Sequence, residues 1–136
     1  MRALLRQNGR RFVSDESGAA AVEFAIISSV FLTLVFGLCY VGIWMFDKSS
    51  LQWAVERASR LAAINSAVTQ SEIADAVNGY LLSEGLPSAD VAYSVSNSSG
   101  FPVASIQASF AQRYTLPFVS TFNITYSADA SIPQGG

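Results

Sequence analysis

A run of 23 residues without a formal charge, at positions 24–46, constrains this chain more than any other feature. As an α-helix this run spans roughly 34 Å, enough to cross a hydrocarbon core about 30 Å thick. A secretory signal peptide has an apolar region of only about 7–15 residues, so this run is too long for one. The competing interpretation is a buried core helix, but a chain of 136 residues has little mass left to surround it. The sequence therefore predicts a transmembrane helix.

The composition narrows the chemistry available to the rest of the chain. Charged residues make up only 13% of the sequence and the net charge is −2, which suggests neither a polycation nor a polyanion as a partner. The absence of His and the presence of a single Cys exclude His-based triads, His-liganded zinc, Cys clusters and an intrachain disulfide. Cys39 lies in the middle of the apolar run, where a thiol is a small packing group. No Ser is accompanied by a base, so we expect neither an enzyme nor a cofactor.

The flanks of the apolar run set its orientation. Residues 1–18 contain four arginines and no lysine: Arg2, Arg6, Arg10 and Arg11. The next basic residue is Lys48, so the positive-inside bias places the N-terminus in the cytoplasm and residues 47–136 outside it. A nucleic-acid patch is the alternative reading of the arginines. Their position beside a membrane span, without interleaved aromatic residues, argues against nucleic acid as a partner.

Aromatic side chains gather at the far end of the run. Tyr40 and Trp44 lie inside its last two turns, and Trp53 follows slightly beyond. Tyr and Trp are typical of membrane interfaces, so we expect these three residues to mark the extracytoplasmic interface.

Glu23 is an acidic residue at the start of the apolar segment. A carboxylate at a membrane edge costs free energy unless it reaches water or a partner, so it is a functional candidate. Its position alone leaves two interpretations open: it marks the cytoplasmic end of the span, or it has a function. Gly18 follows an Arg-rich leader, and Glu23 is the fifth residue after it. This arrangement resembles the cleavage site of type IV prepilins and pseudopilins.

The resemblance implies a processing step and an assembly contact. In that class a membrane-embedded aspartic peptidase cuts after the Gly, here between Gly18 and Ala19, and leaves the apolar segment in place. The cut creates an ammonium group on Ala19, four residues before Glu23. In an assembled filament the resemblance implies that Glu23 meets the terminal amine of a neighbouring subunit, which offsets two charges that are costly in an apolar setting.

The residues that make up this motif are similar to those of one family. Residues 18–25, Gly-Ala-Ala-Ala-Val-Glu-Phe-Ala, include Phe24 next to Glu23, and Leu-Val-Phe-Gly follows at residues 34–37. With the Ala- and Arg-containing stretch at residues 51–62, this resembles the TadE-like pseudopilins of the tight-adherence (Tad/Flp, type IVc) pilus. The resemblance is specific over residues 14–62 and loose beyond, where residues 114–118 are similar. One departure is Ser28-Ser29, near the place where such proteins often carry a Pro; their hydroxyls can bond back to the helix instead.

Membership of that family implies a set of partners and a location. The partners are a prepilin peptidase, the major pilin and other minor pseudopilins, and an inner-membrane assembly platform. The location is a single pass through the inner membrane with a periplasmic or extracellular C-terminal domain, and entry into the pilus used for adhesion. A minor pseudopilin of type II secretion is an alternative within the class. An uncleaved single-span anchor that displays a binding module is an alternative outside it.

Beyond the span, the helical pattern continues and a second helix follows. We expect residues 47–67 to extend the first helix, because no Pro or Gly interrupts residues 43–66. Its apolar face is predicted to pack on its own domain rather than on neighbouring subunits: Leu51, Ala54, Val55, Ala58, Leu61 and Ala62. Thr69 and Glu72 form a capping box for a second helix, which Gly85 and Pro87 end. The carboxylates of this helix form a solvated face, for which only weak Ca²⁺ binding stays open.

From Val91 the apolar pattern alternates with a period of two. It predicts strands at residues 91–96, 103–112 and 122–132, joined by a four-residue turn at residues 97–100 and a longer connection at Pro117. We expect residues 133–136 to be loose. The predicted fold is therefore α+β: a long N-terminal transmembrane helix that continues outside the membrane, a second short helix and a three-stranded antiparallel β-meander. Its parts are a cleaved leader (1–18), a transmembrane and assembly helix (19–46), a helix extension (47–67) and a small domain (68–136).

Overall fold

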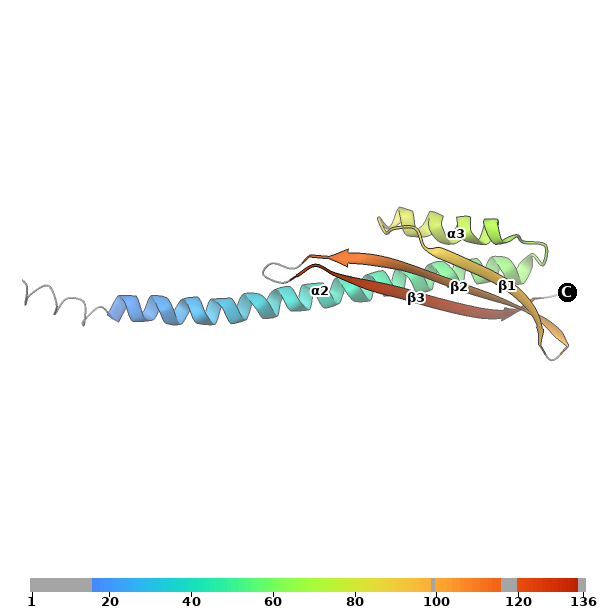
Figure 1. The fold of residues 1–136 in the computed structure, drawn as a ribbon. Helices are drawn as coiled ribbons and strands as arrows, with labels where there is room; N and C mark the ends of the chain where they lie inside the picture. The colour runs from blue at the N-terminus through green and yellow to red at the C-terminus, as the bar shows by residue number, and fades with distance from the viewer. Residues whose placement is uncertain (1–15, 99, 116–119, 135–136) are drawn as a thin grey trace, which may run out of the picture. The chain divides into compact units, whose positions relative to one another are not determined.

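The computed structural model describes residues 16–98, 100–115 and 120–134. The elements in chain order are α2 (Glu16–Ile64), α3 (Gln70–Ser83), β1 (Asp90–Ser98), β2 (Phe101–Tyr114) and β3 (Phe122–Pro133), as Figure 1 shows. The chain divides into two compact units, Met1–Gly42 and Ile43–Gly136, and the second contains α3, the sheet and the C-terminal part of α2. The predicted α+β fold is confirmed, with one long apolar helix, one short helix and a three-stranded antiparallel sheet.

Helix α2 runs without interruption over 49 residues. It stays helical through residues 43–50, where the apolar run ends and the extension begins. The helix ends at Ile64, three residues before the predicted end of the extension. The reason is local: the Asn65 side-chain oxygen accepts a hydrogen bond from the Ala67 amide at 3.1 Å, and this turn competes with a further helical turn.

Helix α3 has the predicted signals at both ends. The Thr69 side chain accepts from the Glu72 amide, and the Glu72 carboxylate accepts from the Thr69 amide at 2.8 Å, which completes the capping box. At the other end Gly85 has a φ of 76°, which favours glycine because a Cβ would be strained there. The Leu86 amide donates to the Leu81 carbonyl and the Gly85 amide to the Leu82 carbonyl, the two bonds of a Schellman motif.

The three strands form an antiparallel sheet in the order β1-β2-β3. Because side chains alternate along a strand, the even positions of β2 lie on one face and its odd positions on the other. Four apolar side chains on the even face are buried: Ala104, Ile106, Ala108 and Phe110. The odd face carries Ser105, Gln107 and Ser109, which are exposed or half-buried. The predicted division into one covered and one solvated face is correct.

The core of the second unit lies between the sheet and the two helices. On α2 the predicted apolar face is fully buried apart from Leu61, which is half-buried. Ile73, Val77 and Leu81 of α3 are also buried. The Asn78 side chain holds α3 to the start of β1, since it accepts from the Ala89 amide at 2.7 Å and donates to the Ala89 carbonyl at 3.3 Å. The Ala-rich face therefore packs within its own unit, as predicted.

Two local predictions are wrong. The ladder between β1 and β2 continues to the pair Ser98 and Phe101, so the turn is shorter than the four residues expected. Gly100, with a φ of 88°, permits this tighter connection. The chain end is not loose at Pro133 and Gln134 either. Pro133 pairs with Val103, and the buried Gln134 side chain donates to the Ala62 carbonyl and the Tyr93 hydroxyl. Pro117 and residues 135–136 lie outside the described residues.

Candidate membrane and assembly segment

The predicted cleavage site lies in the described N-terminal part of α2. Gly18 and Ala19 are both helical and exposed there. The bond between them is therefore on the surface of the helix, and its role as a cleavage site stays a prediction. The leader before Glu16 lies outside the described residues.

Glu23 and Phe24 lie one turn further along the same helix. Glu23 is exposed, and its carboxylate has no hydrogen-bond or ion-pair partner among residues 16–98, 100–115 and 120–134. Phe24 is 72% exposed, so its ring is available to a neighbouring molecule or to lipid. The spacing from Ala19 to Glu23 corresponds to a rise of about 6 Å along the helix axis. The structure thus brings the four predicted processing and assembly residues into one exposed helical segment, and their roles stay predictions.

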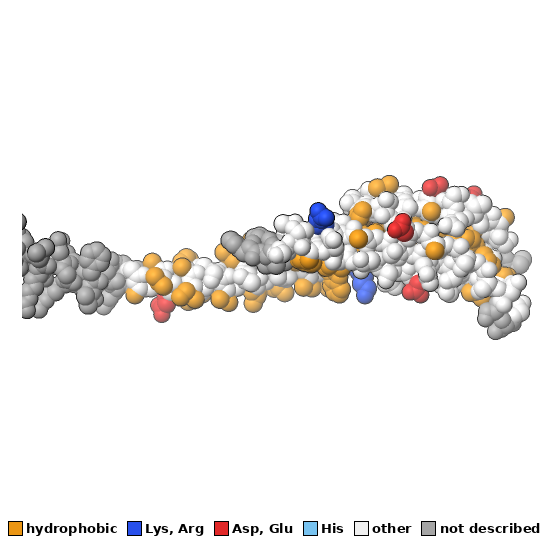
Figure 2. Space-filling view, viewed as in Figure 1, with side chains coloured by type: hydrophobic (Ala, Val, Ile, Leu, Met, Phe, Trp, Pro, Cys, Tyr) orange, Lys and Arg blue, Asp and Glu red, His pale blue; other side chains and the backbone are white. Residues whose placement is uncertain are grey.

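The apolar run is exposed on every side of the helix. Fourteen of its large hydrophobic side chains, from Phe24 to Phe46, are exposed, and Figure 2 shows hydrophobic groups along the first part of α2. Among the described residues, α2 is the one helix long and apolar enough to cross a membrane, and its most apolar stretch has no buried residue. A core helix would bury one face. The helix fits a single-pass membrane anchor.

Two hydroxyl groups within the run donate to carbonyl groups of the preceding helical turn. Ser29 Oγ donates to the Ile26 carbonyl at 2.8 Å, and Thr33 Oγ1 donates to the Ser29 carbonyl at 2.8 Å. Such bonds back to the preceding turn remove the cost of placing a hydroxyl in hydrocarbon. Ser29 therefore bonds to the helix as the sequence suggested. Cys39 is an exposed free thiol in this segment.

The end of the run carries the predicted interfacial side chains. Tyr40 is half-buried, and Trp44 is exposed over a large part of its surface. The Lys48 ammonium lies 5.8 Å from the centre of the Trp44 ring, in the range of a cation–π contact. A lysine that folds over an aromatic ring at the end of an apolar run matches the side-chain pattern of a membrane interface. Trp53 is exposed two and a half turns further on, and its place in the aromatic belt stays a prediction.

A buried polar cluster just beyond the span escaped the sequence reasoning. The Tyr114 hydroxyl donates to the Asp47 carboxylate, and the Tyr126 hydroxyl lies 2.5 Å from that of Tyr114. Because the Tyr114 proton is used on Asp47, Tyr126 donates to Tyr114. All three residues are buried, so α2, β2 and β3 are joined by one chain of hydrogen bonds. The only sequence signal was an acidic residue, Asp47, inside a continuous helical pattern.

The two tyrosines of this cluster resist ionisation. Burial, followed by the hydrogen bonds to Asp47 and Tyr126, raises the pKa of Tyr114 well above its usual value near 10. Burial also raises the pKa of Tyr126, and the charge of Asp47 acts in the same direction. A phenolate beside the buried Asp47 carboxyl group is unfavourable, so both tyrosines stay protonated over the neutral pH range.

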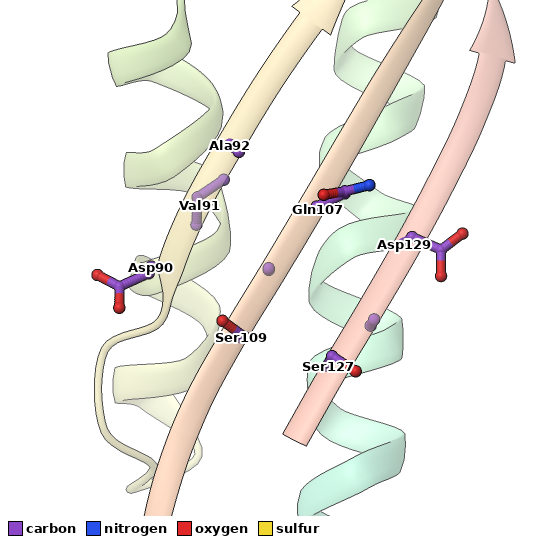
Figure 3. Close-up of a pocket in the computed structure, with 9 residues that line it drawn as sticks. Asp90, Val91, Ala92, Gln107, Ser109, Ser127 and Asp129 are labelled. Atoms are coloured by element: carbon purple, nitrogen blue, oxygen red, sulfur yellow. The ribbon is translucent and has the colours of Figure 1, made fainter. Parts of the chain in front are cut away.

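The open face of the sheet carries a shallow hollow of about 540 Å³. Figure 3 shows Asp90 at the edge strand β1 and Asp129 at the edge strand β3, with Gln107, Ser109 and Ser127 between them. The two carboxylates point outward, away from each other, so they do not converge on a cation. Among the described residues no group of three or more His, Cys, Asp or Glu side chains is placed to hold a metal.

The comparison with protein families decides the relationship of the N-terminal segment. Residues 18–60 match the family model described as TadE-like protein. The resemblance seen in the sequence is therefore confirmed over these residues, which include the exposed run and the first turns of α2 beyond it. TadE-like proteins are related to the Tad pilus, so the match relates the chain to a pilus component. Comparisons with curated proteins and with solved structures gave no match.

Proposed function

We propose that the protein is a minor pilin of the TadE-like type. A prepilin peptidase cuts between Gly18 and Ala19 on the cytoplasmic side of the inner membrane. The remaining chain stays anchored by α2 with its domain outside the cytoplasm. It then joins the major pilin and other minor pseudopilins at the assembly platform, where it initiates or enters a Tad/Flp pilus that attaches the cell to surfaces. The proposed role is structural and not enzymatic.

One observation carries the proposal: the TadE-like match starts at Gly18, where the cut is proposed. A motif that consisted only of the membrane span would not need to include the six residues before Phe24. Those residues supply the features that processing and assembly require, namely a Cβ-free residue before the cut and a carboxylate one turn after it.

The chemistry of assembly follows from the new N-terminus. The Ala19 ammonium would sit at the start of α2, where the helix dipole is unfavourable for a positive charge. Glu23, exposed and without a partner in the described structure, supplies the opposite charge. When the ammonium of one subunit meets the carboxylate of the next in an apolar setting, each offsets the desolvation of the other. The contact therefore favours side-by-side packing of spans at a defined stagger.

The N-terminus of the protein from its native membrane tests the cut. We expect N-terminal sequencing to begin at Ala19 and the intact mass to lack residues 1–18. Gly18→Ser should preserve the N-terminus at Met1, because a side chain at this position obstructs the peptidase cleft. Gly42→Ser is the matched control, since Gly42 has open space around it and should be processed normally. A wild-type N-terminus at Met1, with the peptidase present, would instead support an uncleaved anchor that displays a binding module.

Glu23 substitutions separate the cut from assembly. We expect Glu23→Ala to be cleaved as the wild type is, while the amount recovered in sheared pili or in complexes with other pilins falls at least about tenfold. Glu23→Asp keeps the charge and should retain most of the incorporation. Equal incorporation of the Glu23→Ala protein would remove this carboxylate from the assembly role.

A further inference from the structure

A groove on the outside of the second unit has no role in the proposed processing or in the core. It is lined by Trp53, Glu56, Arg57 and Arg60 of α2 and by Tyr80 of α3, and its volume is about 270 Å³. Trp53, Arg57 and Arg60 follow each other at spacings of four and three residues, so they form one stripe along the helix. We call these five residues the arginine groove.

The fold leaves the arginine groove unused. The buried face of α2 is the opposite one, with Leu51, Ala54 and Ala58 fully or almost fully buried, whereas Trp53 is 61% exposed. Neither guanidinium has an ion-pair or hydrogen-bond partner within the part of the chain that the structure describes, and Glu56 accepts a hydrogen bond from Gln52 at 3.3 Å. Trp, Tyr and Arg are the residue types most enriched at binding hot spots. The groove has the composition of a protein-binding surface for a carboxylate.

Distance along the helix argues against lipid as the occupant. Arg57 and Arg60 lie about 16 Å and about 21 Å beyond Phe46, at 1.5 Å per residue. The headgroup layer extends only about 5–8 Å beyond the hydrocarbon on each side. Lipid phosphates therefore lie below the reach of both guanidinium groups, and a protein carboxylate is the better ligand.

The chain itself carries a complementary surface on the outer side of α3. Asp75, Gly79 and Leu82 are exposed there and are separated by the same four and three residues as the arginine stripe. Leu82 is 63% exposed, and a side chain at Gly79 would meet nothing within 4 Å. The two stripes have equal length, about 10 Å, and each has an apolar end and a charged end.

Orientation decides how the two stripes meet. The short connection between the helices makes α3 run opposite to α2, as Figure 1 shows. Two copies inserted in one membrane with the same orientation therefore present α2 of one antiparallel to α3 of the other. This alignment places Trp53 against Leu82 and Arg60 against Asp75, while Arg57 faces the side-chain-free surface at Gly79. Reversing either stripe would place a charge against an apolar side chain.

From this complementarity we propose that the arginine groove binds the Asp75–Leu82 stripe of a second copy of the chain. The contact is heterologous, because the groove of each copy takes the stripe of the next, and such contacts either close into rings or extend into open arrays. The proposal rests on the single-pass insertion in the proposed function but not on the cut after Gly18. It adds a contact outside the membrane to the proposed contact of Glu23 with a neighbouring N-terminus.

Site-specific photo-crosslinking in native membranes tests this contact. One tagged full-length copy carries p-benzoylphenylalanine in place of Trp53, and a second copy carries a different tag. We expect a crosslinked product with both tags. Asp75→Arg in the second copy, or Arg60→Asp in the first, should lower its yield about fivefold, since an attraction becomes a repulsion. Combining the two variants should restore it. All substituted side chains are exposed, so the fold is retained.

Matched control variants and N-terminal sequencing of the crosslinked product distinguish the possible outcomes. Glu84→Arg in the second copy and Arg113→Asp in the first reverse other exposed charges and should leave the yield unchanged. A product that contains only lipid or an unrelated protein, or a yield indifferent to Asp75→Arg, would overturn the proposal. Crosslinking between copies that still begin at Met1 would support this contact while overturning the proposed cut, so the two failures are distinguishable.

Discussion

At the scale of single residues, the polar cluster of Asp47, Tyr114 and Tyr126 is the feature with the largest energetic consequence. A buried carboxylate is stable only while its hydrogen bonds are made, and here it accepts from Tyr114. Two aromatic contacts support the same region: Phe110 stacks on Tyr126 with ring centroids 5.1 Å apart, and Tyr114 stacks on Phe122 at 5.8 Å. The cluster therefore fixes the C-terminal end of β2 and the N-terminal part of β3 against α2.

Removing the Tyr114 hydroxyl should weaken the domain measurably. Tyr114→Phe keeps the ring but takes away the proton donated to Asp47, so we expect a loss of about 1–3 kcal/mol in the free energy of unfolding. Urea unfolding of the full chain in detergent, followed by near-ultraviolet circular dichroism, measures this change. Tyr80→Phe is the matched control, because Tyr80 lies at the surface groove. Equal midpoints for the two variants would show that the cluster does not stabilise the fold.

The same cluster predicts a pH dependence with a definite sign. The folded-state pKa of Tyr114 is raised above the unfolded value near 10, so its contribution to stability is fully present below about pH 10. That contribution is lost as the pH rises through the raised pKa. Absorbance at 295 nm should show Tyr114 and Tyr126 still protonated at about pH 11, roughly one unit above the ordinary tyrosine pKa near 10. Ionisation of these two tyrosines near pH 10 would contradict the buried hydrogen bonds.

At the scale of elements, the sequence predicts those features that depend on neighbouring residues and misses those that depend on tertiary contacts. The Thr69 capping box and Gly85 could be predicted because each satisfies helix-end groups with nearby residues. The cluster at Asp47 was not readable, because its partners lie 67 or more positions away in the sequence. Gln134 escaped for the same reason, since its contacts with Ala62 and Tyr93 exist only after the sheet has formed.

Removing the N-cap of α3 should cost about 1 kcal/mol in the free energy of unfolding. In Thr69→Ala the Glu72 amide loses its side-chain acceptor, while packing in the core is unchanged. Urea unfolding measures the loss, and Ser66→Ala at an exposed position of the preceding loop is the control. A Thr69→Ala protein as stable as the control would contradict the cap.

The capping box also predicts a pH dependence. A hydrogen bond from the Thr69 amide, followed by one from the Thr69 hydroxyl, lowers the pKa of the Glu72 carboxyl group. The stabilisation by Glu72 should therefore hold above its unfolded pKa of about 4.5 and fade as the pH falls below it.

At the scale of the whole molecule, charge is divided unevenly between the proposed leader and the rest of the chain. The leader has four of the eight basic residues and two of the ten acidic ones, so the chain after the proposed cut keeps four basic and eight acidic side chains, a net −4. Two of the four remaining cations, Arg57 and Arg60, lie in the arginine groove. This pair of cations on an otherwise acidic subunit gives it a directional means of association, which a uniform distribution would not give.

The membrane assignment yields the sharpest prediction at this scale. Leu34 lies near the centre of the apolar run and is 58% exposed, so Leu34→Arg removes no buried contact. A charge at the middle of a membrane helix costs about 2.5–3.5 kcal/mol on the insertion scale, so we expect Leu34→Arg to shift much of the protein from the carbonate-resistant membrane fraction to the extractable one. Gln52→Arg, an exposed position on α2 beyond the run, should leave the distribution unchanged. If both variants stayed in the membrane fraction to the same extent, residues 24–46 would not span the bilayer. If both were extracted, the cause would be a general effect of added positive charge on α2.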